Sequence, residues 1–232
     1  MSARARWITF DCFGTLMDWN SWLVATLEPL GGAIPPLARA YFAHERLVQR
    51  EPPLRTYREV IVTALLRAAD ERGIRLSDAE ARAVPEAWGA MRRFDDVESM
   101  LAELRLRGWR LGVLTNCDDD LFAITHGSFN APFDLVITSQ RVRGYKPGPW
   151  HFRAFEQITG VARDRWVHVS SSWYHDIAPA RALGLNHVWL DREGTGPASA
   201  PFVRVTSGAE VSHAIEGIFE TQPPLPALCA GP

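Results

Sequence analysis

Five short apolar runs constrain the fold of this 232-residue chain more than any other feature. Val, Ile, Leu, Phe and Trp fill them without polar alternation, which is typical of parallel strands covered on both faces. The runs lie at 7–10, 110–115, 134–138, 166–170 and 187–191. Segments of helical pattern lie around the later runs, at 95–108, 149–160, 176–185 and 208–219. Strand and helix alternate, which predicts an α/β fold with a doubly wound parallel sheet of Rossmann type.

The segment 20–92 breaks this alternation, because it has helical patterns throughout and no strand signal. Its helices are expected near 21–30, 36–50, 56–72 and 77–92. We therefore predict an all-helical domain of residues 20–92, inserted after the first strand of a core that comprises 1–19 and 93–221. The Pro-rich segment 222–232 is expected to be a loose tail.

The charge and cysteine content argue against several classes of protein. The formal net charge is −2 and the basic residues are scattered, so we expect neither nucleic acid nor a membrane surface as partner. Cys12, Cys117 and Cys229 follow no metal-ligand spacing, which indicates free thiols in a reducing compartment. We expect a cytoplasmic protein. The sequence leaves the oligomeric state open, with a homodimer as one alternative.

Polar side chains gather where the predicted strands end. The candidates are Asp11 after the first strand, Thr115 and Asn116 at the second, Lys146 in the loop after the third, and Ser170 and Asp176 at the fourth. In open α/β sheets ligands bind beyond these carboxyl ends, so we expect one site built on a nucleophilic carboxylate. Lys146 would hold Asp11 ionised, and Asp176 would anchor Lys146, orient a water or help to hold a cation.

The remaining polar candidates would bind an anionic substrate group. They are Thr15, Thr115, Asn116 and Ser170, together with backbone N–H groups that follow Asp11. Each candidate also has a structural interpretation. Asn116 and Asp176 can cap helices, Lys146 can be a solvated loop residue, and serine runs are common in turns.

These segments resemble, in order and spacing, the four motifs of the haloacid dehalogenase superfamily. "DCFGTL" (11–16) is similar to its first motif, "LTN" (114–116) to its second, Lys146-Pro147 to its third, and the region ending at Asp176 to its fourth. The resemblance covers nearly the whole chain. It implies that the helical insert is the cap of that family.

The residue two positions after Asp11 separates the branches of the superfamily. Phosphatases and mutases carry a second Asp there, which protonates the leaving oxygen, whereas this chain has Phe13. A halide leaves as a stable anion and needs no proton. "FDCFGTLMDW" (10–19) is similar to the opening of type II (L-specific) 2-haloacid dehalogenases. The resemblance implies conversion of short 2-haloacids to 2-hydroxy acids through an ester on Asp11, without a cofactor.

Some positions depart from the type II pattern. In the type II pattern the fourth motif is Ser-Ser-Asn with an Asp three residues after the Asn. This chain reads "SSSWYHD" (170–176), which is one residue longer and lacks the Asn. Phe152 stands where those enzymes carry a Tyr. Ala43 stands where they carry an arginine that receives halide and carboxylate, and Arg39 and Arg46, about one helical turn away, are the candidates to replace it.

Two alternatives therefore stay open beside the dehalogenase. One is a phosphatase-like hydrolase that uses Asp11 with Mg²⁺, with Asp11, Phe13 and Asp176 around the ion. The other is a family member that keeps the fold and binds a ligand or partner without turnover.

Overall fold

A single parallel sheet forms the core of the computed structural model, which describes residues 5–30, 34–194, 196 and 202–220. In sequence order its strands are β1 (Trp7–Phe10), β2 (Arg110–Thr115), β3 (Leu135–Thr138), β4 (Trp166–Ser170), β5 (Asn186–Leu190) and β6 (Val203–Val205). Their order across the sheet is β3-β2-β1-β4-β5-β6. The predicted fold class is confirmed, and the five predicted strands match within one residue. The edge strand β6 was not predicted, because a three-residue run carries too little pattern.

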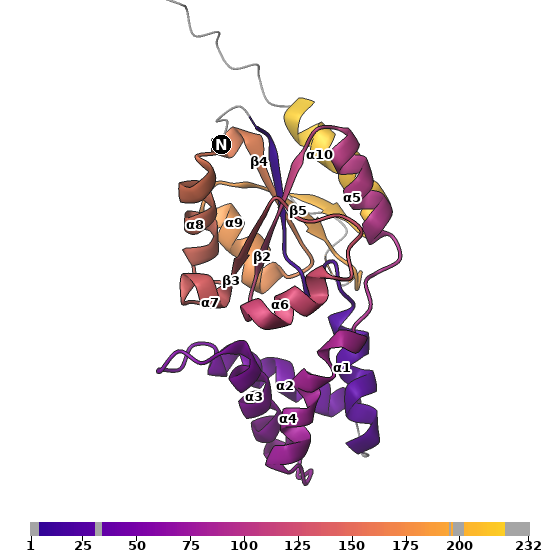
Figure 1. Cartoon of the computed structure of the whole chain (residues 1–232), viewed down its shortest axis with the longest axis vertical. Helices are drawn as coiled ribbons and strands as arrows, with labels where there is room; N and C mark the ends of the chain where they lie inside the picture. Colours follow the sequence, from indigo (N-terminus) through magenta and orange to yellow (C-terminus); the bar gives the residue numbers. More distant parts are fainter. Residues whose placement is uncertain (1–4, 31–33, 195, 197–201, 221–232) are drawn as a thin grey trace, which may run out of the picture.

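Helices cover both faces of this sheet (Figure 1). The core helices are α5 (Val97–Leu106), α6 (Asp119–His126), α7 (Ser139–Val142), α8 (Trp150–Thr159), α9 (Ala178–Ala182) and α10 (Gly208–Glu220). Alternate residues of β1 face opposite layers: Trp7 packs in the apolar cluster under α8 and α9, and Ile8 in the cluster that includes α5 and α10. The two buried faces explain why the strand sequences are continuously apolar.

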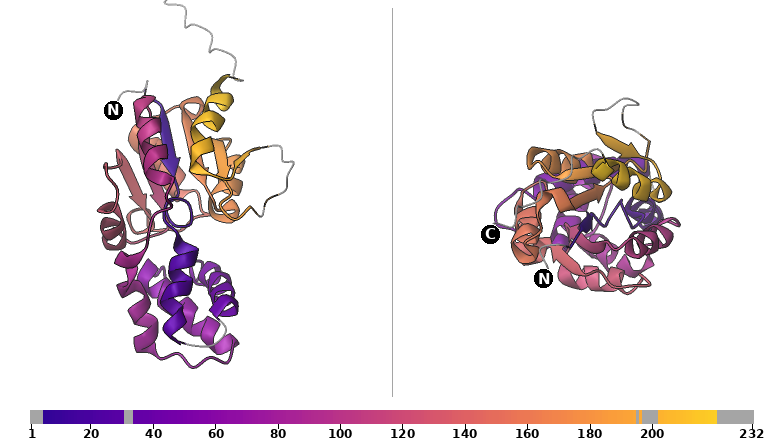
Figure 2. Two further views of the ribbon diagram at one scale, coloured as in Figure 1. Left: turned by 90° about the vertical axis from the view of Figure 1, so that its right-hand side faces the viewer. Right: turned by 90° about the horizontal axis from the view of Figure 1, so that it is seen from above.

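Between β1 and α5, the described part of the chain contains helices and no strand. They are α1 (Trp19–Leu27), α2 (Ile34–Val48), α3 (Tyr57–Glu71) and α4 (Asp78–Glu86), with short 3₁₀ turns at Glu28–Leu30 and Trp88–Ala90. They form a separate group beyond the carboxyl ends of the strands (Figures 1 and 2). We call this group the cap. The exact domain boundaries stay a prediction.

Other predictions concern the thiols and the tail. Cys12 and Cys117 are buried free thiols, as expected. Cys229 and the predicted tail 222–232 lie outside the described residues. Among the described residues, none of the helices combines the length and the apolar character that a membrane span requires.

Two chain crossings connect the cap to the core, and they pair with each other. The backbone N–H of Asp18, on the way out, donates to the carbonyl of Arg92, on the way back, at 2.8 Å. Phe94 N–H donates in turn to the carbonyl of Leu16 at 3.1 Å. Because these bonds join the two crossings directly, they fix the orientation of the cap where it leaves the sheet.

An aromatic cluster fills the space beside these crossings. Phe13, in the loop after β1, packs edge-on against Trp19 and Trp88, with ring centroids 6.1 and 4.8 Å away. Trp22 completes the cluster, 4.9 Å from Trp19 and 5.4 Å from Trp88. The indole N–H of Trp88 donates to Thr125 of α6, so the cluster is tied to the core as well as to the cap.

A second connection between core and cap is the carboxylate of Asp118. It accepts the backbone N–H of Tyr57 at 2.8 Å and of Arg58 at 3.0 Å, both in the first turn of α3. Thr56 accepts the next N–H, from Glu59. The unpaired donors of a helix N-terminus are thus satisfied partly from the other domain, and the negative charge lies at the positive end of the helix dipole.

Replacing Asp118 by alanine is therefore expected to lower the free energy of unfolding by about 1–2 kcal/mol, the usual effect of losing a helix cap. Urea unfolding followed by circular dichroism measures this change. Asp70→Ala is the matched control, because Asp70 is an exposed carboxylate of the same helix. An equal loss in both variants would show that Asp118 does not support the cap.

Candidate active site

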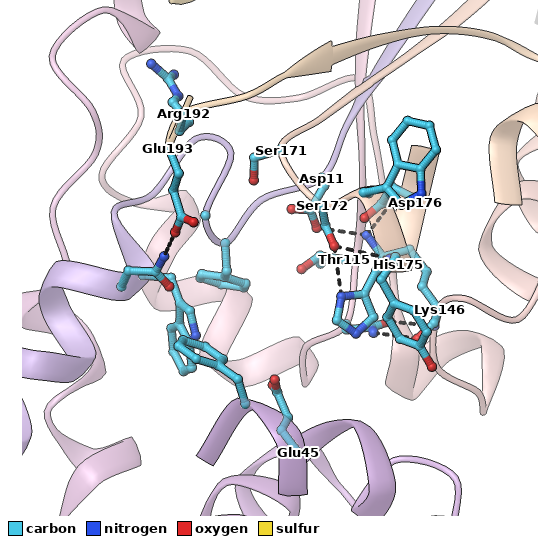
Figure 3. A pocket seen from close by; sticks show the side chains of 18 of the residues that line it. Asp11, Glu45, Thr115, Lys146, Ser171, Ser172, His175, Asp176, Arg192 and Glu193 are labelled. Carbon is cyan, nitrogen blue, oxygen red and sulfur yellow. Dashed lines mark hydrogen bonds and ion pairs between the residues drawn. The ribbon is translucent and has the colours of Figure 1, made fainter. Parts of the chain in front are cut away.

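Parallel strand ends bring polar side chains of distant sequence position to one edge of the sheet (Figure 3). Asp11 follows β1, and Thr115 is the last residue of β2. Asp176 lies in a helical turn after β4, and Lys146 reaches in from the loop between α7 and α8. Asp11, Thr115, Lys146 and Asp176 all line the same cavity, so the structure places them together as predicted.

Lys146 lies at the centre of this group and is almost completely buried, with 1% of its surface exposed. Its Nζ donates to Asp11 Oδ1 at 2.8 Å, to Asp176 Oδ1 at 2.7 Å and to the Leu114 carbonyl at 2.8 Å. An ammonium group has three donors, so all of them are used. The lysine is therefore held in a single position between two carboxylates.

The loop after β1 folds back so that Thr15 supports Asp11. The hydroxyl of Thr15 donates to Asp11 Oδ2 at 2.8 Å and accepts the backbone N–H of Ser171 at 2.9 Å. Gly14 has a φ of +87°, a conformation that side chains rarely adopt, which explains the glycine at this turn. Thr15 is fully buried and contacts the nucleophile candidate, but it is not among the residues that line the cavity.

The charges of the three groups are coupled. Burial raises the pKa of Asp11, and Lys146 opposes this effect. Burial also favours the neutral form of Asp176, but Lys146 and a hydrogen bond from His168 outweigh it, and the pKa of Asp176 lies well below its usual range. For Lys146, burial is outweighed by the two carboxylates, which raise its pKa. The pKa values of the two carboxylates are thus pushed apart, and Asp11 is the more readily protonated.

A buried hydrogen-bond chain supports Asp176 from behind. Trp166 Nε1 donates to Thr9 Oγ1 at 2.8 Å, Thr9 Oγ1 lies 2.9 Å from His168 Nδ1, and His168 Nε2 lies 2.9 Å from Asp176 Oδ1. A neutral imidazole with its proton on Nε2 satisfies the whole chain. Sequence reasoning missed Thr9 and His168. Their signal is that both are polar residues inside otherwise apolar strands, and they are register partners in β1 and β4.

The fourth motif accommodates its additional residue in a π-helical turn, Trp173–Ile177, which precedes the short helix α9. The predicted helix over 176–185 therefore begins earlier and ends sooner than expected. A π turn contains one residue more than an α turn, so it can absorb an insertion without displacing the next part of the chain. The side chain of Asp176 consequently still reaches Lys146.

Two predicted substrate-binding residues, Asn116 and Ser170, form hydrogen bonds with the backbone, and of the two only Asn116 lines the cavity. Asn116 holds the backbone of Lys146 from both sides, since its Nδ2 donates to the carbonyl at 3.0 Å and its Oδ1 accepts the N–H at 2.8 Å. Ser170 is fully buried, and its hydroxyl accepts the backbone N–H of Ser172. Ser171 and Ser172, rather than Ser170, line the cavity.

The cavity has a volume of about 750 Å³ and lies between core and cap. Its cap side is formed by Trp19, Phe42, Glu45, Arg46, Gln49 and Tyr57. Within the described part of the chain, four polar side-chain atoms that belong to cavity-lining residues are buried without a protein partner: Thr115 Oγ1, Tyr174 OH, His175 Nε2 and Asp176 Oδ2. Burial lowers the pKa of His175 to about 4, so its imidazole is neutral at neutral pH. Buried polar atoms without partners favour binding of water or a polar ligand.

The structure treats the two arginine candidates of the cap differently. Arg46 lines the cavity, and its guanidinium lies 4.8 Å from the ring centroid of Tyr174, which belongs to the core. Arg39 is exposed and is not among the lining residues. Of the two, only Arg46 is placed where it can contact a ligand of Asp11.

Three of the four carboxylate oxygens of Asp11 and Asp176 already accept hydrogen bonds from protein donors. Mg²⁺ prefers six oxygen ligands in near-octahedral geometry. Here the Oδ1 atoms of Asp11 and Asp176 both accept from Lys146, and Asp11 Oδ2 accepts from Thr15. In the described ranges no group of three or more His, Cys, Asp and Glu side chains is arranged to hold a metal. The positive charge between the two carboxylates is supplied by the lysine.

A doubly wound parallel sheet with a helical cap over a carboxylate–lysine centre defines a class of capped, Rossmann-type α/β proteins. The chain belongs to the haloacid dehalogenase-like hydrolase family, whose model matches residues 5–184. This confirms the predicted superfamily.

The sequence identity to individual relatives is low. The chain is 26% identical to haloacetate dehalogenase H-2 of Moraxella sp. (strain B) over 195 residues, which cover 81% of this chain and 86% of that protein. It is 34% identical to the phosphoserine phosphatase of Thermus thermophilus over 139 residues, 56% of each chain. The crystal structure of an L-2-haloacid dehalogenase matches with a TM-score of 0.82 at 23% identity, over 91% of this chain and 99% of that one. The structural match shows a shared fold.

Proposed function

We propose that this protein is a hydrolytic dehalogenase that converts short 2-haloacids to 2-hydroxy acids through an ester on Asp11. One observation carries the proposal. The Asp11 carboxylate, held by Lys146 and Thr15, faces the cavity. Two residues after Asp11 the chain has Phe13, whose ring packs against Trp19 and Trp88. That position supplies no proton to a leaving group, and a halide needs none. The similarity to a haloacetate dehalogenase over most of both chains supports the same reaction class.

In the first step, an oxygen of Asp11 attacks the α-carbon of the substrate. A carbon–oxygen bond forms, the carbon–halogen bond breaks, and halide leaves with its electron pair. Lys146 and Thr15 hold the attacking group in place, so little reorganisation is needed when it reacts. The cap forms one side of the cavity in which the substrate would lie.

In the second step, water attacks the carbonyl carbon of the Asp11 ester and releases the 2-hydroxy acid, one proton and the free carboxylate. The proposed water-positioning groups are Asp176 Oδ2 and His175 Nε2, because both are buried atoms of cavity-lining residues and have no protein partner. Lys146 stays between Asp11 and Asp176 throughout and balances their charge. The reaction requires no cofactor. The buried free thiols support a reducing, cytoplasmic setting as part of this proposal.

The second candidate is a Mg²⁺-dependent phosphatase, which the partial similarity to a phosphoserine phosphatase favours. Against it, Lys146 already lies between the Asp11 and Asp176 carboxylates that would hold the ion, and Thr15 donates to the other oxygen of Asp11. Mg²⁺-dependent release of phosphate from an aryl phosphate, without halide release from 2-chloropropionate, would support this candidate. Failure of both assays would favour the third alternative, a family member that binds a ligand or partner without turnover.

A single turnover of 2-chloropropionate in oxygen-18 water, with a chelator present, tests the mechanism. The label is expected in the carboxylate of Asp11 and not in the first product molecule, because water attacks the ester carbonyl rather than the substrate carbon. Mass spectrometry of the Asp11 peptide and of the product measures both. Label in the first product, retained configuration at the α-carbon, or loss of the reaction on chelation would contradict the proposal.

A further inference from the structure

The cap presents a buried carboxyl group to the cavity that the motif analysis did not find. Glu45, in the middle of α2, is 6% exposed and lines the cavity on the side opposite the strand ends (Figure 3). It lies on the apolar stripe of the helix, in line with Leu37, Tyr41 and Val48, which are all buried. A glutamate at such a position is rarely buried unless it has partners or a ligand.

The hydrogen bonds of Glu45 are unequal between its two oxygens. Oε1 accepts from the hydroxyl of Tyr57 at 2.6 Å and, more weakly, from that of Tyr41 at 3.5 Å. Among the described residues, Oε2 has no hydrogen-bond partner in the structure. When the carboxyl group is neutral, its proton belongs on Oε2, because the two tyrosine hydroxyls already donate to Oε1.

The charged and titratable groups around Glu45 come from several elements. Tyr41 and Arg46 share its helix, Tyr57 belongs to α3, and Asp11 and Tyr145 lie on the core side. Burial is the largest effect and raises the pKa of Glu45 to about 7, with Asp11 adding to the rise and the tyrosine hydroxyls and Arg46 opposing it. A bound anion in the cavity would favour the neutral form further.

We propose that Glu45 binds the carboxylate of the substrate as a neutral acid, through a hydrogen bond donated by its Oε2 hydroxyl. In the type II pattern an arginine at the position of Ala43 receives the substrate carboxylate. Glu45 would take over this role with a neutral hydrogen-bond donor. The identity of the ligand rests on the proposed function, whereas the donor role of Glu45 rests on its own contacts. Tyr57 and Tyr41 are positioning residues, because they determine which oxygen carries the proton.

The test is calorimetric titration of the full-length protein with propionate, an unreactive carboxylate of substrate size, between pH 5.5 and 8.5. Affinity is expected to fall about tenfold per pH unit above the pKa of Glu45, because the neutral form that binds is then lost. Titrations in two buffers of different ionisation enthalpy should show proton uptake on binding. Glu45→Gln keeps a neutral donor at every pH, so its affinity should vary less with pH and the proton uptake should fall.

Two further variants separate donation from simple relief of charge repulsion. Glu45→Leu has neither charge nor donor and should bind propionate at least about tenfold more weakly than Glu45→Gln. Glu28→Gln changes an exposed cap glutamate and should behave as wild type. Equal affinity of the Leu and Gln variants, or an unchanged pH dependence in Glu45→Gln, would overturn the inference. So would wild-type binding of ethylamine in preference to propionate.

The halide assay keeps this test separate from that of the proposed function. Propionate binding with the expected pH dependence but no halide release from any 2-haloacid would leave the role of Glu45 intact and reject the dehalogenase. Halide release with propionate binding that does not depend on Glu45 would do the reverse.

Discussion

Asp11→Asn is expected to lower the rate of halide release by a factor on the order of 10⁴ or more, as removal of an attacking group usually does. The amide has nearly the same shape as the carboxylate but is a far weaker nucleophile. Its oxygen can still accept from Thr15 or Lys146, and the loss of one of two neighbouring negative charges offsets the lost ion pair. The thermal unfolding temperature should therefore change little.

The measurement is halide release from 2-chloropropionate under conditions in which wild type completes many turnovers. Mass spectrometry of the intact protein must exclude deamidation of the new asparagine, which would restore the nucleophile. Asp18→Asn, at a cavity-lining aspartate that caps α1, controls for a general loss of charge in the cavity and should keep most of the activity. Wild-type activity in undeamidated Asp11→Asn protein would reject Asp11 as the attacking group.

Lys146→Met is expected to reduce activity by about 10²–10³-fold and to lower stability by about 3–5 kcal/mol, since it leaves two buried carboxylates without their counter-charge. Removing the ammonium takes away the effect that lowers the pKa of Asp11, so this pKa rises further. Because Asp11 attacks as a carboxylate, activity is lost as the pH falls through its pKa. The acid limb of the pH–rate profile should therefore move to higher pH.

Pre-steady-state rates measured against pH, together with urea unfolding at each pH, test both parts. The unfolding measurement does not depend on activity. The stability lost in Lys146→Met should be partly recovered at low pH, because the two carboxylates are then protonated. Arg143→Met, an exposed cation in the same loop, is the matched control and should change neither quantity. An unshifted acid limb in Lys146→Met would mean that Lys146 does not control the charge of Asp11.

The core of the candidate site could be predicted from the sequence because it depends on local order along the chain. A polar residue at the end of an apolar strand, or directly after it, lies where the parallel strands end, and this placed Asp11 and Thr115. Asp176 reaches the same place from the helical turn that follows β4. Lys146 was harder, because a lysine before a proline is usually solvated, and only the order of the four motifs indicated its position. The structure buries it completely.

The features that could not be predicted depend on how separate elements pack. Arg39 and Arg46 are both candidates on the helix, and only the docking of the cap on Tyr174 distinguishes them. Glu45 was overlooked because its importance comes from two tyrosines and from the direction in which α2 faces the sheet. Thr9 and His168 were overlooked because each lies inside a run that was interpreted as an apolar strand.

The aromatic cluster at the two chain crossings also has a practical consequence for measurement. Trp19, Trp22 and Trp88 lie with their rings packed together beside Phe13, next to the loop that carries the proposed nucleophile. Closely packed aromatic side chains in fixed orientations produce near-ultraviolet circular dichroism, which disappears when tertiary packing loosens while helices persist. The unmodified protein therefore contains chromophores at the contact between cap and core, and loosening of that contact is expected to change its near-ultraviolet circular dichroism.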